Sequence, residues 1–208
     1  TALANIGFFK EVIDLAQKNN ILICHDAAYT EVAFNGCKPI SFLEVEGAMD
    51  VGVEFQSLSK TFSMTGWRIG FAAGNKRAVA GLGKVKTNID SGVFQAVQVA
   101  ATAALNNYEL GLEERINVYK ERVDLFCKSL DEAGIKHQKP EATFYIWFEV
   151  PSGITSAEFC SRLLEDAGII VTPGNGFGEY GEGYARASVT FETERILKAA
   201  DRIKEFKF

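Results

Sequence analysis

The chain has 208 residues, of which 47% are hydrophobic, and a formal net charge of −5. This composition is sufficient to bury a globular core, and it fits either one large domain or two modest ones. Acidic and basic residues are mixed along the whole length, which argues against a nucleic acid or an anionic membrane as a partner.

The first part of the sequence predicts helices that alternate with short buried strands. Apolar residues recur at helical spacing over residues 7–19, which indicates an amphipathic helix. The apolar run Ile21–Cys24 is short and does not alternate, as in a strand covered on both faces within a parallel sheet. Residues 51–58 and 68–74 have the same character. Such alternation favours an α/β fold.

Two helices of different amino-acid composition are predicted in the middle of the chain. Residues 91–106 form a stretch of small residues suited to close packing, and residues 109–133 form a long, charged amphipathic segment. We place a domain boundary near the start of the second helix. The predicted domains are therefore residues 1–110 and residues 111–208.

The predicted secondary structure changes after this boundary. Three segments are strand-like, namely residues 142–150, 169–173 and 184–191. A helix is predicted after the T-x-x-E capping box at Thr155 and Glu158, and a last helix at residues 192–206. This pattern predicts a small α+β domain behind part of a larger α/β domain.

The four cysteines offer no metal site. They are scattered at positions 24, 37, 127 and 160, without the spacing of a zinc site or a paired redox motif. We expect free thiols in a reducing compartment, and no apolar stretch is long enough to cross a bilayer. The sequence therefore predicts a cytoplasmic protein without a metal.

Lys60 follows the apolar segment 51–58 directly. A lysine at the end of a buried strand is partly desolvated, and desolvation disfavours its ammonium form. A neutral amine attacks aldehydes, and the aldehyde that proteins most often hold as a Schiff base is pyridoxal 5'-phosphate. Lys60 is therefore a candidate catalytic residue.

This cofactor makes three further demands, and the sequence offers residues for each. Its phosphate needs donors, which Ser57, Ser59 and the forked guanidinium of Arg68 can supply. Its pyridine nitrogen needs a carboxylate in water-poor surroundings, and Asp26 follows an apolar run. Its phenolic oxygen needs a donor, and Tyr29 lies three residues beyond Asp26. Strand ends in open α/β sheets are where such ligands bind.

Each of these residues also has an ordinary structural interpretation. Lys60 alone is more often a solvated surface lysine, Asp26 a turn or capping residue, and Arg68 a member of a surface ion pair. The joint order changes this balance. D-x-x-Y is followed by S-x-S-K and, five residues later, by G-x-R-x-G, each at a predicted strand end. The order favours a cofactor site.

The stretches "HDAAYTEVAF" and "SLSKTFSMTGWRIGFAAGN" resemble the class I/II, fold-type I pyridoxal-phosphate aminotransferases. The resemblance implies the C-terminal part of a large three-layer α/β/α domain with a mostly parallel sheet, followed by a small α+β domain. It assigns Lys60 to the Schiff base and Asp26, Tyr29, Ser57, Ser59 and Arg68 to cofactor binding.

The same resemblance extends to the substrate. Arg186, in "GYARASVTF", matches the arginine that binds the substrate α-carboxylate, and a guanidinium suits a carboxylate better than lysine does. Asn88 matches a residue that reaches the substrate site of a neighbouring subunit, so a homodimer is implied. The family also implies earlier strands and cofactor contacts before residue 7. We expect these 208 residues to be a fragment that lacks an N-terminal half.

Several activities remain open on this resemblance. "GWRIGFAAGN" and "GKVKTNIDSGVFQAVQ" are most similar to the branch of the family that transfers an amino group between LL-diaminopimelate and 2-oxoglutarate in lysine biosynthesis. Alternatives are transamination of aspartate, alanine or aromatic amino acids, or a C–S lyase that uses the same cofactor. An alternative of another class is a non-catalytic remnant that binds no cofactor.

Two other features are given structural interpretations. "GFGEYG", residues 176–181, fits G-x-G-x-x-G, but a strand and not a helix is predicted after it, so the dinucleotide-binding interpretation fails. We interpret it as a flexible loop leading to Arg186. His25 lies beside Asp26, and we expect it to donate a hydrogen bond to that carboxylate.

Overall fold

A computed structural model describes residues 2–206, which divide into two compact units. Residues 3–113 form the first unit, and residues 114–206 form the second, with which residue 2 is grouped. The boundary predicted from the sequence lies between residues 110 and 111. The assignment of the first part to a large cofactor-binding domain stays a prediction. No helix within residues 2–206 is both long and apolar enough to cross a membrane.

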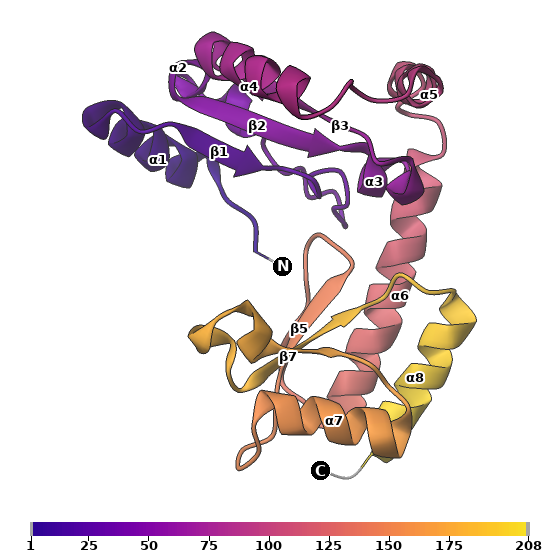
Figure 1. The fold of residues 1–208 in the computed structure, drawn as a ribbon. Helices are drawn as coiled ribbons and strands as arrows, with labels where there is room; N and C mark the ends of the chain where they lie inside the picture. Colours follow the sequence, from indigo (N-terminus) through magenta and orange to yellow (C-terminus); the bar gives the residue numbers. More distant parts are fainter. Residues whose placement is uncertain (1, 207–208) are drawn as a thin grey trace. The chain divides into compact units, whose positions relative to one another are not determined.

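The first unit contains one sheet and several helices. Its longer elements are α1 (Ile6–Asn19), β1 (Ile23–Asp26), β2 (Gly52–Ser57), β3 (Gly70–Gly74), α4 (Lys76–Ile89) and α5 (Gln95–Asn106). Its short helices are η1 (Phe42–Glu44), α2 (Ala48–Val51), α3 (Leu58–Thr61) and η2 (Thr65–Trp67). Figure 1 shows α4 running along β2 and β3. The periodicity of the sequence did not predict α4.

Helix α1 begins and ends at asparagines. The Asn5 side chain caps it by accepting a hydrogen bond from the Phe8 N–H at 2.9 Å, and Asn20 ends it in a left-handed conformation with φ 52°. The helix predicted over residues 7–19 is therefore confirmed. Its buried residues Phe9 and Ile13 follow the helical spacing from which it was predicted.

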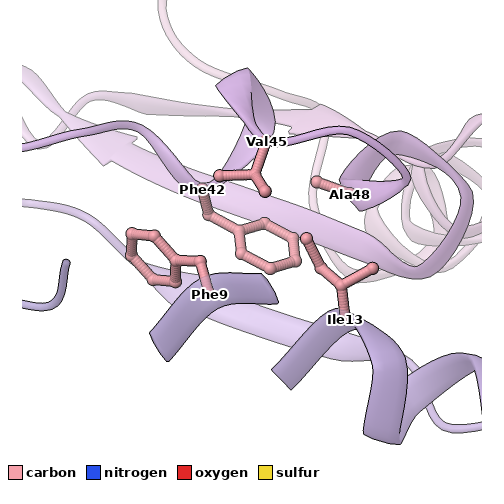
Figure 2. Packing of buried hydrophobic residues seen from close by; sticks show 5 residues of the cluster. All are labelled: Phe9, Ile13, Phe42, Val45 and Ala48. Carbon is pink, nitrogen blue, oxygen red and sulfur yellow. The ribbon is translucent and has the colours of Figure 1, made fainter. Parts of the chain in front are cut away.

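The core of the first unit forms where α1 meets the segment before β2. Phe9 and Ile13 of α1 pack against Phe42, Val45 and Ala48, as Figure 2 shows. The rings of Phe9 and Phe42 meet edge to face at 5.6 Å. This packing anchors α1 and the chain from Phe42 to Ala48 beside the sheet.

The sheet order in this unit is β1-β2-β3, with β1 parallel and β3 antiparallel to β2. The α/β class is confirmed, but this part of the sheet is mixed. A parallel connection needs a crossover, usually a helix of several turns. Residues 58–69 contain only the short α3 and η2, so the chain turns back and β3 runs antiparallel.

The first strand also differs from its predicted form. We predicted a strand at Ile21–Cys24 covered on both faces, whereas β1 begins at Ile23 and its residues alternate between half-buried and exposed. The Ile21 N–H bonds to the Ala16 carbonyl at 2.9 Å, so this residue takes part in the C-terminal cap of α1 and not in the sheet. The Ile21 and Leu22 side chains are exposed.

The second unit is a four-stranded antiparallel sheet with three helices. Its elements are α6 (Leu112–Glu132), β4 (His137–Gln138), β5 (Tyr145–Glu149), α7 (Ser156–Ala167), β6 (Thr172–Pro173), η3 (Gly174–Phe177), η4 (Glu179–Gly181), β7 (Tyr184–Ser188) and α8 (Thr193–Glu205). The strand order is β4-β5-β7-β6. The predicted long helix, strands and last helix of this region are present (Figure 1).

One face of this second sheet is buried against helices. Ile146 and Phe148 of β5 are fully buried, and the Phe148 ring contacts Phe126 of α6 and Phe159 of α7. Because successive strand residues point to opposite faces, Tyr145 and the other alternate residues of β5 lie on the second face. This second face also carries Arg186 of β7, opposite Trp147 in the register.

Helix α7 begins as its capping motif predicts. The Thr155 hydroxyl accepts a hydrogen bond from the Glu158 N–H at 3.2 Å, and Gly168 ends the helix with φ 62°. The loop predicted at residues 176–181 instead forms two turns of 3₁₀ helix, η3 and η4. No α-helix follows them within the described residues before β7, as expected when the dinucleotide-binding interpretation was rejected.

A substitution at Gly52 tests the core of the first unit. A Cβ at this position would lie 2.1 Å from a ring carbon of Phe42, which is itself buried. We expect G52A to lower the free energy of unfolding by about 1–3 kcal/mol through overpacking. The measurement is chemical denaturation of the purified protein.

G81A is the matched control. Gly81 lies within α4, and a Cβ there would meet no atom within 4 Å. Alanine is the better helix former by about 1 kcal/mol, so this variant should be neutral or slightly stabilised. Equal stability of G52A and G81A would contradict the packing described for Phe42.

Candidate active site

Three chain segments meet at one edge of the first sheet. Because β1 and β2 are parallel, their carboxyl ends, Asp26 and Ser57, lie at the same edge. Because β3 is antiparallel, its first residue, Gly70, lies there too and pairs with Ser57. The strand directions therefore bring the segments that carry Asp26, Lys60 and Arg68 to the same edge of this sheet.

Gly70 is required by the closeness of β2 and β3 at this edge. A Cβ on Gly70 would lie 2.4 Å from the Gln56 carbonyl oxygen, a distance that no side chain tolerates without movement of the backbone. The Leu58 N–H bonds to the Ile69 carbonyl at 3.3 Å, which continues the pairing one step past the strands. The turn that contains Lys60 is thus tied to the start of β3.

Lys60 lies on a single helical turn directly after β2. The Ser57 hydroxyl caps this turn by accepting a hydrogen bond from the Ser59 N–H at 3.2 Å. Ser59 is buried and Lys60 is half-buried. The Lys60 Nζ lies 5.7 Å from the centroid of the Tyr29 ring. Two of the predicted residues, Lys60 and Tyr29, are therefore neighbours although they are far apart in sequence.

Asp26 occupies the predicted strand end but in different surroundings. Its side chain is exposed, and its Oδ1 accepts a long hydrogen bond, 3.4 Å, from the Ala28 N–H. We predicted water-poor surroundings for this carboxylate. Cys24 and Asp26 share one face of β1, whereas His25 lies on the face that Phe9 of α1 covers. The exposed face is the reason for the difference.

Arg68 is placed by a tight turn before β3. Its backbone is left-handed, with φ 52°, which is uncommon for a residue other than glycine. Its Nη1 donates to the Thr65 carbonyl at 3.0 Å, and the Thr65 hydroxyl donates to the Ser59 carbonyl at 3.0 Å. These bonds connect the guanidinium, which is exposed, to the turn that carries Ser59 and Lys60.

His25 does not bond to Asp26, and that expectation was wrong. Its Nδ1 donates to Oε2 of Glu54 at 3.1 Å, because the parallel register places Glu54 directly beside it. The imidazole also packs against the rings of Phe9 and Phe42, at 5.3 and 5.9 Å between centroids. His25 therefore points toward the core of the unit and away from the predicted site.

Glu54 is the buried acid that the sequence analysis missed. Its side chain accepts hydrogen bonds from the Ser41 hydroxyl at 3.0 Å, the Phe42 N–H at 2.9 Å and the Gln56 amide at 2.8 Å, in addition to His25. Burial alone would raise its pKa, but the bonds from Gln56, His25, Ser41 and Phe42 outweigh burial and lower the pKa. An acid within the apolar run 51–58 was the available signal.

Arg186 lies in the second unit, on the open face of its sheet. Its guanidinium carbon is 4.1 Å from the centroid of the Tyr145 ring and 4.3 Å from that of Phe177. Neither ring was predicted from the sequence as part of the site. Tyr145 was placed only as part of a strand, and Phe177 only as part of a loop.

Asn88 lies near the end of α4 and is exposed. Its side-chain amide donates to the Lys84 carbonyl at 2.7 Å, within its own helix. A role at a neighbouring subunit's substrate site stays a prediction.

The fold and the site define the class of protein. The sequence profile of the family described as aminotransferase class I and II matches residues 2–203. The chain therefore belongs to this family, whose members use pyridoxal phosphate. The half-buried amine of Lys60 beside the Tyr29 ring, at an edge shared with Asp26 and Arg68, fits this cofactor.

Individual relatives within this family share about half of their residues with this chain over the matched region. The LL-diaminopimelate aminotransferase of Desulforudis audaxviator is 52% identical over 203 residues, which are 98% of this chain and 52% of that protein. The protein of the same name from Aquifex aeolicus is 53% identical over 207 residues, 100% of this chain and 54% of that protein. The chain spans about half the length of the curated relatives it matches.

Solved structures agree with the fold. An aminotransferase from Staphylococcus aureus matches with a TM-score of 0.93 at 38% identity, covering 98% of this chain and 54% of that one. A probable N-succinyldiaminopimelate aminotransferase from Thermus thermophilus matches with a TM-score of 0.90 at 36% identity, covering 98% and 55%. The predicted fold type I is thereby confirmed.

Replacement of Glu54 tests the buried network. E54Q turns one acceptor oxygen into a donor that faces the donors of Ser41 and Gln56. We expect a loss of about 1–3 kcal/mol in the free energy of unfolding at neutral pH. The control E46Q changes an exposed glutamate and should stay within about 0.5 kcal/mol of the wild type.

The pH dependence of this difference has a defined sign. The folded pKa of Glu54 is lowered from 4.5, so its carboxylate stabilises the protein above that pH and loses this effect as the pH falls through the folded pKa. The stability difference between wild type and E54Q should therefore shrink below pH 4.5. Denaturation curves at several pH values measure it, and a difference independent of pH would contradict the network.

Proposed function

We propose that the protein containing this chain is a pyridoxal-phosphate-dependent aminotransferase that transfers an amino group between LL-diaminopimelate and 2-oxoglutarate. The observation that carries the proposal is the meeting of Asp26, Lys60 and Arg68 at one sheet edge, with the Lys60 Nζ 5.7 Å from the Tyr29 ring. The substrate pair is supported by relatives named LL-diaminopimelate aminotransferase at 52–53% identity.

The proposed roles follow from the chemistry of each side chain. When bound, the cofactor supplies an aldehyde and an electron-withdrawing ring that stabilises negative charge at the substrate Cα. Lys60 would hold that aldehyde through Nζ, and its amine would act as general base and acid by taking the proton from the substrate Cα and passing it to the cofactor's C4' carbon. The position of Lys60 on a capped turn directly after β2 supports this role.

The remaining residues are proposed to bind the cofactor and orient it. The Asp26 carboxylate would hold a proton on the pyridine nitrogen, and the Tyr29 hydroxyl would donate to the phenolic oxygen. The Arg68 guanidinium offers forked donors to the phosphate, with the hydroxyls of Ser57 and Ser59. The Ser57 hydroxyl already accepts the Ser59 N–H, so its own proton is available for donation.

Arg186 completes the proposed set by binding the substrate α-carboxylate through two parallel hydrogen bonds. Asn88 and a homodimeric assembly are proposed from the family resemblance. A cytoplasmic location is proposed from the scattered cysteines. Amino acids and 2-oxo acids are the proposed small-molecule partners.

Replacement of Lys60 tests the cofactor assignment. In the protein at its full natural length, K60A should lose the visible absorbance of bound pyridoxal phosphate and nearly all transaminase activity, because no other amine takes its place. K18A, an exposed lysine at the end of α1, is the control and should keep both. An unchanged absorbance band in K60A would refute the assignment.

The products distinguish the proposed reaction from its alternatives. With LL-diaminopimelate and 2-oxoglutarate, we expect glutamate to form at a kcat/KM at least about tenfold above that for aspartate, alanine or aromatic amino acids, a difference of about 1.4 kcal/mol. Release of pyruvate and ammonia from a thioether substrate would indicate a C–S lyase. A wild-type protein without cofactor absorbance would indicate a non-catalytic protein.

A further inference from the structure

The Arg186 guanidinium is held between two aromatic rings from different elements. Tyr145 comes from β5 and Phe177 from η3, and their ring centroids lie 4.1 and 4.3 Å from the guanidinium carbon. Within residues 2–206, no carboxylate forms an ion pair with Arg186. The Arg186 guanidinium therefore contacts two aromatic rings, and no salt bridge within these residues neutralises its charge.

The sheet register fixes the first ring. Arg186 pairs with Trp147 on β5, so Tyr145, two residues before Trp147, lies diagonally across from Arg186 on the same face. The intervening residue, Ile146, is fully buried on the opposite face. The register of β5 therefore places Tyr145 beside Arg186, and a one-residue shift of that register would expose Ile146.

The second ring is fixed by a close contact between backbones. A Cβ on Gly174 would lie 2.0 Å from the Gly181 carbonyl oxygen, so the two ends of the η3–η4 segment touch without side chains between them. The Gly178 N–H also bonds to the Asn175 carbonyl at 3.2 Å. Phe177 lies within this closed segment, and its ring meets Trp147 at 5.6 Å.

Stacked rings and carboxylate binding use different parts of a guanidinium. The Arg186 guanidinium carbon lies over the rings of Tyr145 and Phe177, and a guanidinium that stacks on a ring keeps its N–H donors in its own plane. Stacking therefore restricts the rotation of a long side chain and leaves the donor edge available. A carboxylate then binds with less loss of conformational entropy than it would to a mobile arginine.

We propose that Tyr145 and Phe177 are positioning residues that hold the Arg186 guanidinium for the carboxylate of the amino-acid or 2-oxo-acid substrate. This inference rests on the proposed function of Arg186. A positioning role of this kind acts on the bound substrate and the transition state alike, because the carboxylate takes no part in the proton transfer. It should therefore appear in KM and leave kcat largely unchanged.

The test compares variants that remove a ring with variants that keep it. Y145L and F177L remove one ring each, and Y145F and F177Y keep a ring at the same place. In the cofactor-loaded protein at its full natural length, each leucine variant should raise the KM for 2-oxoglutarate about three- to tenfold, with kcat within about twofold of wild type. The ring-keeping variants should stay near wild type.

Calorimetric titration with succinate provides a readout without turnover. Succinate carries carboxylates but no reacting group, and its Kd should rise in Y145L and F177L by the same factor as KM. R186K is included in both assays, because lysine cannot offer two donors in one plane. It should weaken binding at least as much as either leucine variant.

The outcomes separate the inference from the function on which it rests. If R186K weakens binding but Y145L and F177L match Y145F and F177Y, the positioning role is wrong and the role of Arg186 stands. If R186K changes neither KM nor the succinate Kd, the role of Arg186 itself is wrong. Because the two rings come from separate elements, either leucine variant decides the question if the other fails to fold. A fall in kcat without a change in KM would also overturn the proposal.

Discussion

The direction of three strands is the constraint on which the first unit depends. A parallel pair, β1 and β2, presents both carboxyl ends at one edge, and the antiparallel β3 begins at that edge. Three separate stretches of sequence thereby bring an acid, an amine and a guanidinium to the same edge of the sheet. A parallel β3 would have begun at the opposite edge and taken Arg68 away from Lys60.

Three charged side chains, Glu54, Asp26 and Arg186, have different surroundings. Glu54 is buried and compensated by several donors, as a carboxylate in an apolar region must be. Asp26 is exposed and makes one long bond. Arg186 is half-buried and lies over two aromatic rings, which attract its charge and accept no proton from it. The Glu54 carboxylate is compensated by donors of the protein itself. The Asp26 carboxylate and the Arg186 guanidinium have fewer such partners and can each bind a ligand.

Local sequence patterns predicted many of the helices and strands and the candidate site residues. The features that they did not predict depend on pairing between residues far apart in the sequence. The helix over residues 7–19 follows from its own periodicity, and the order of the candidate residues along the chain was enough to select them. The direction of β3 depends on the connection before it. The bond between His25 and Glu54 joins positions 29 apart, and the contact of Phe177 with Arg186 depends on a closed turn. Neither pairing has a signature in a short window of sequence.

The network around Glu54 also has an evolutionary consequence. Its donors come from three stretches of chain, at His25, at Ser41–Phe42 and at Gln56. A chain that lost the acid by mutation would keep several buried donors without an acceptor, and one that lost a donor would keep a less compensated charge. We therefore expect substitutions at positions 25, 41, 54 and 56 to be coupled, because a change at one of them leaves a buried partner unsatisfied.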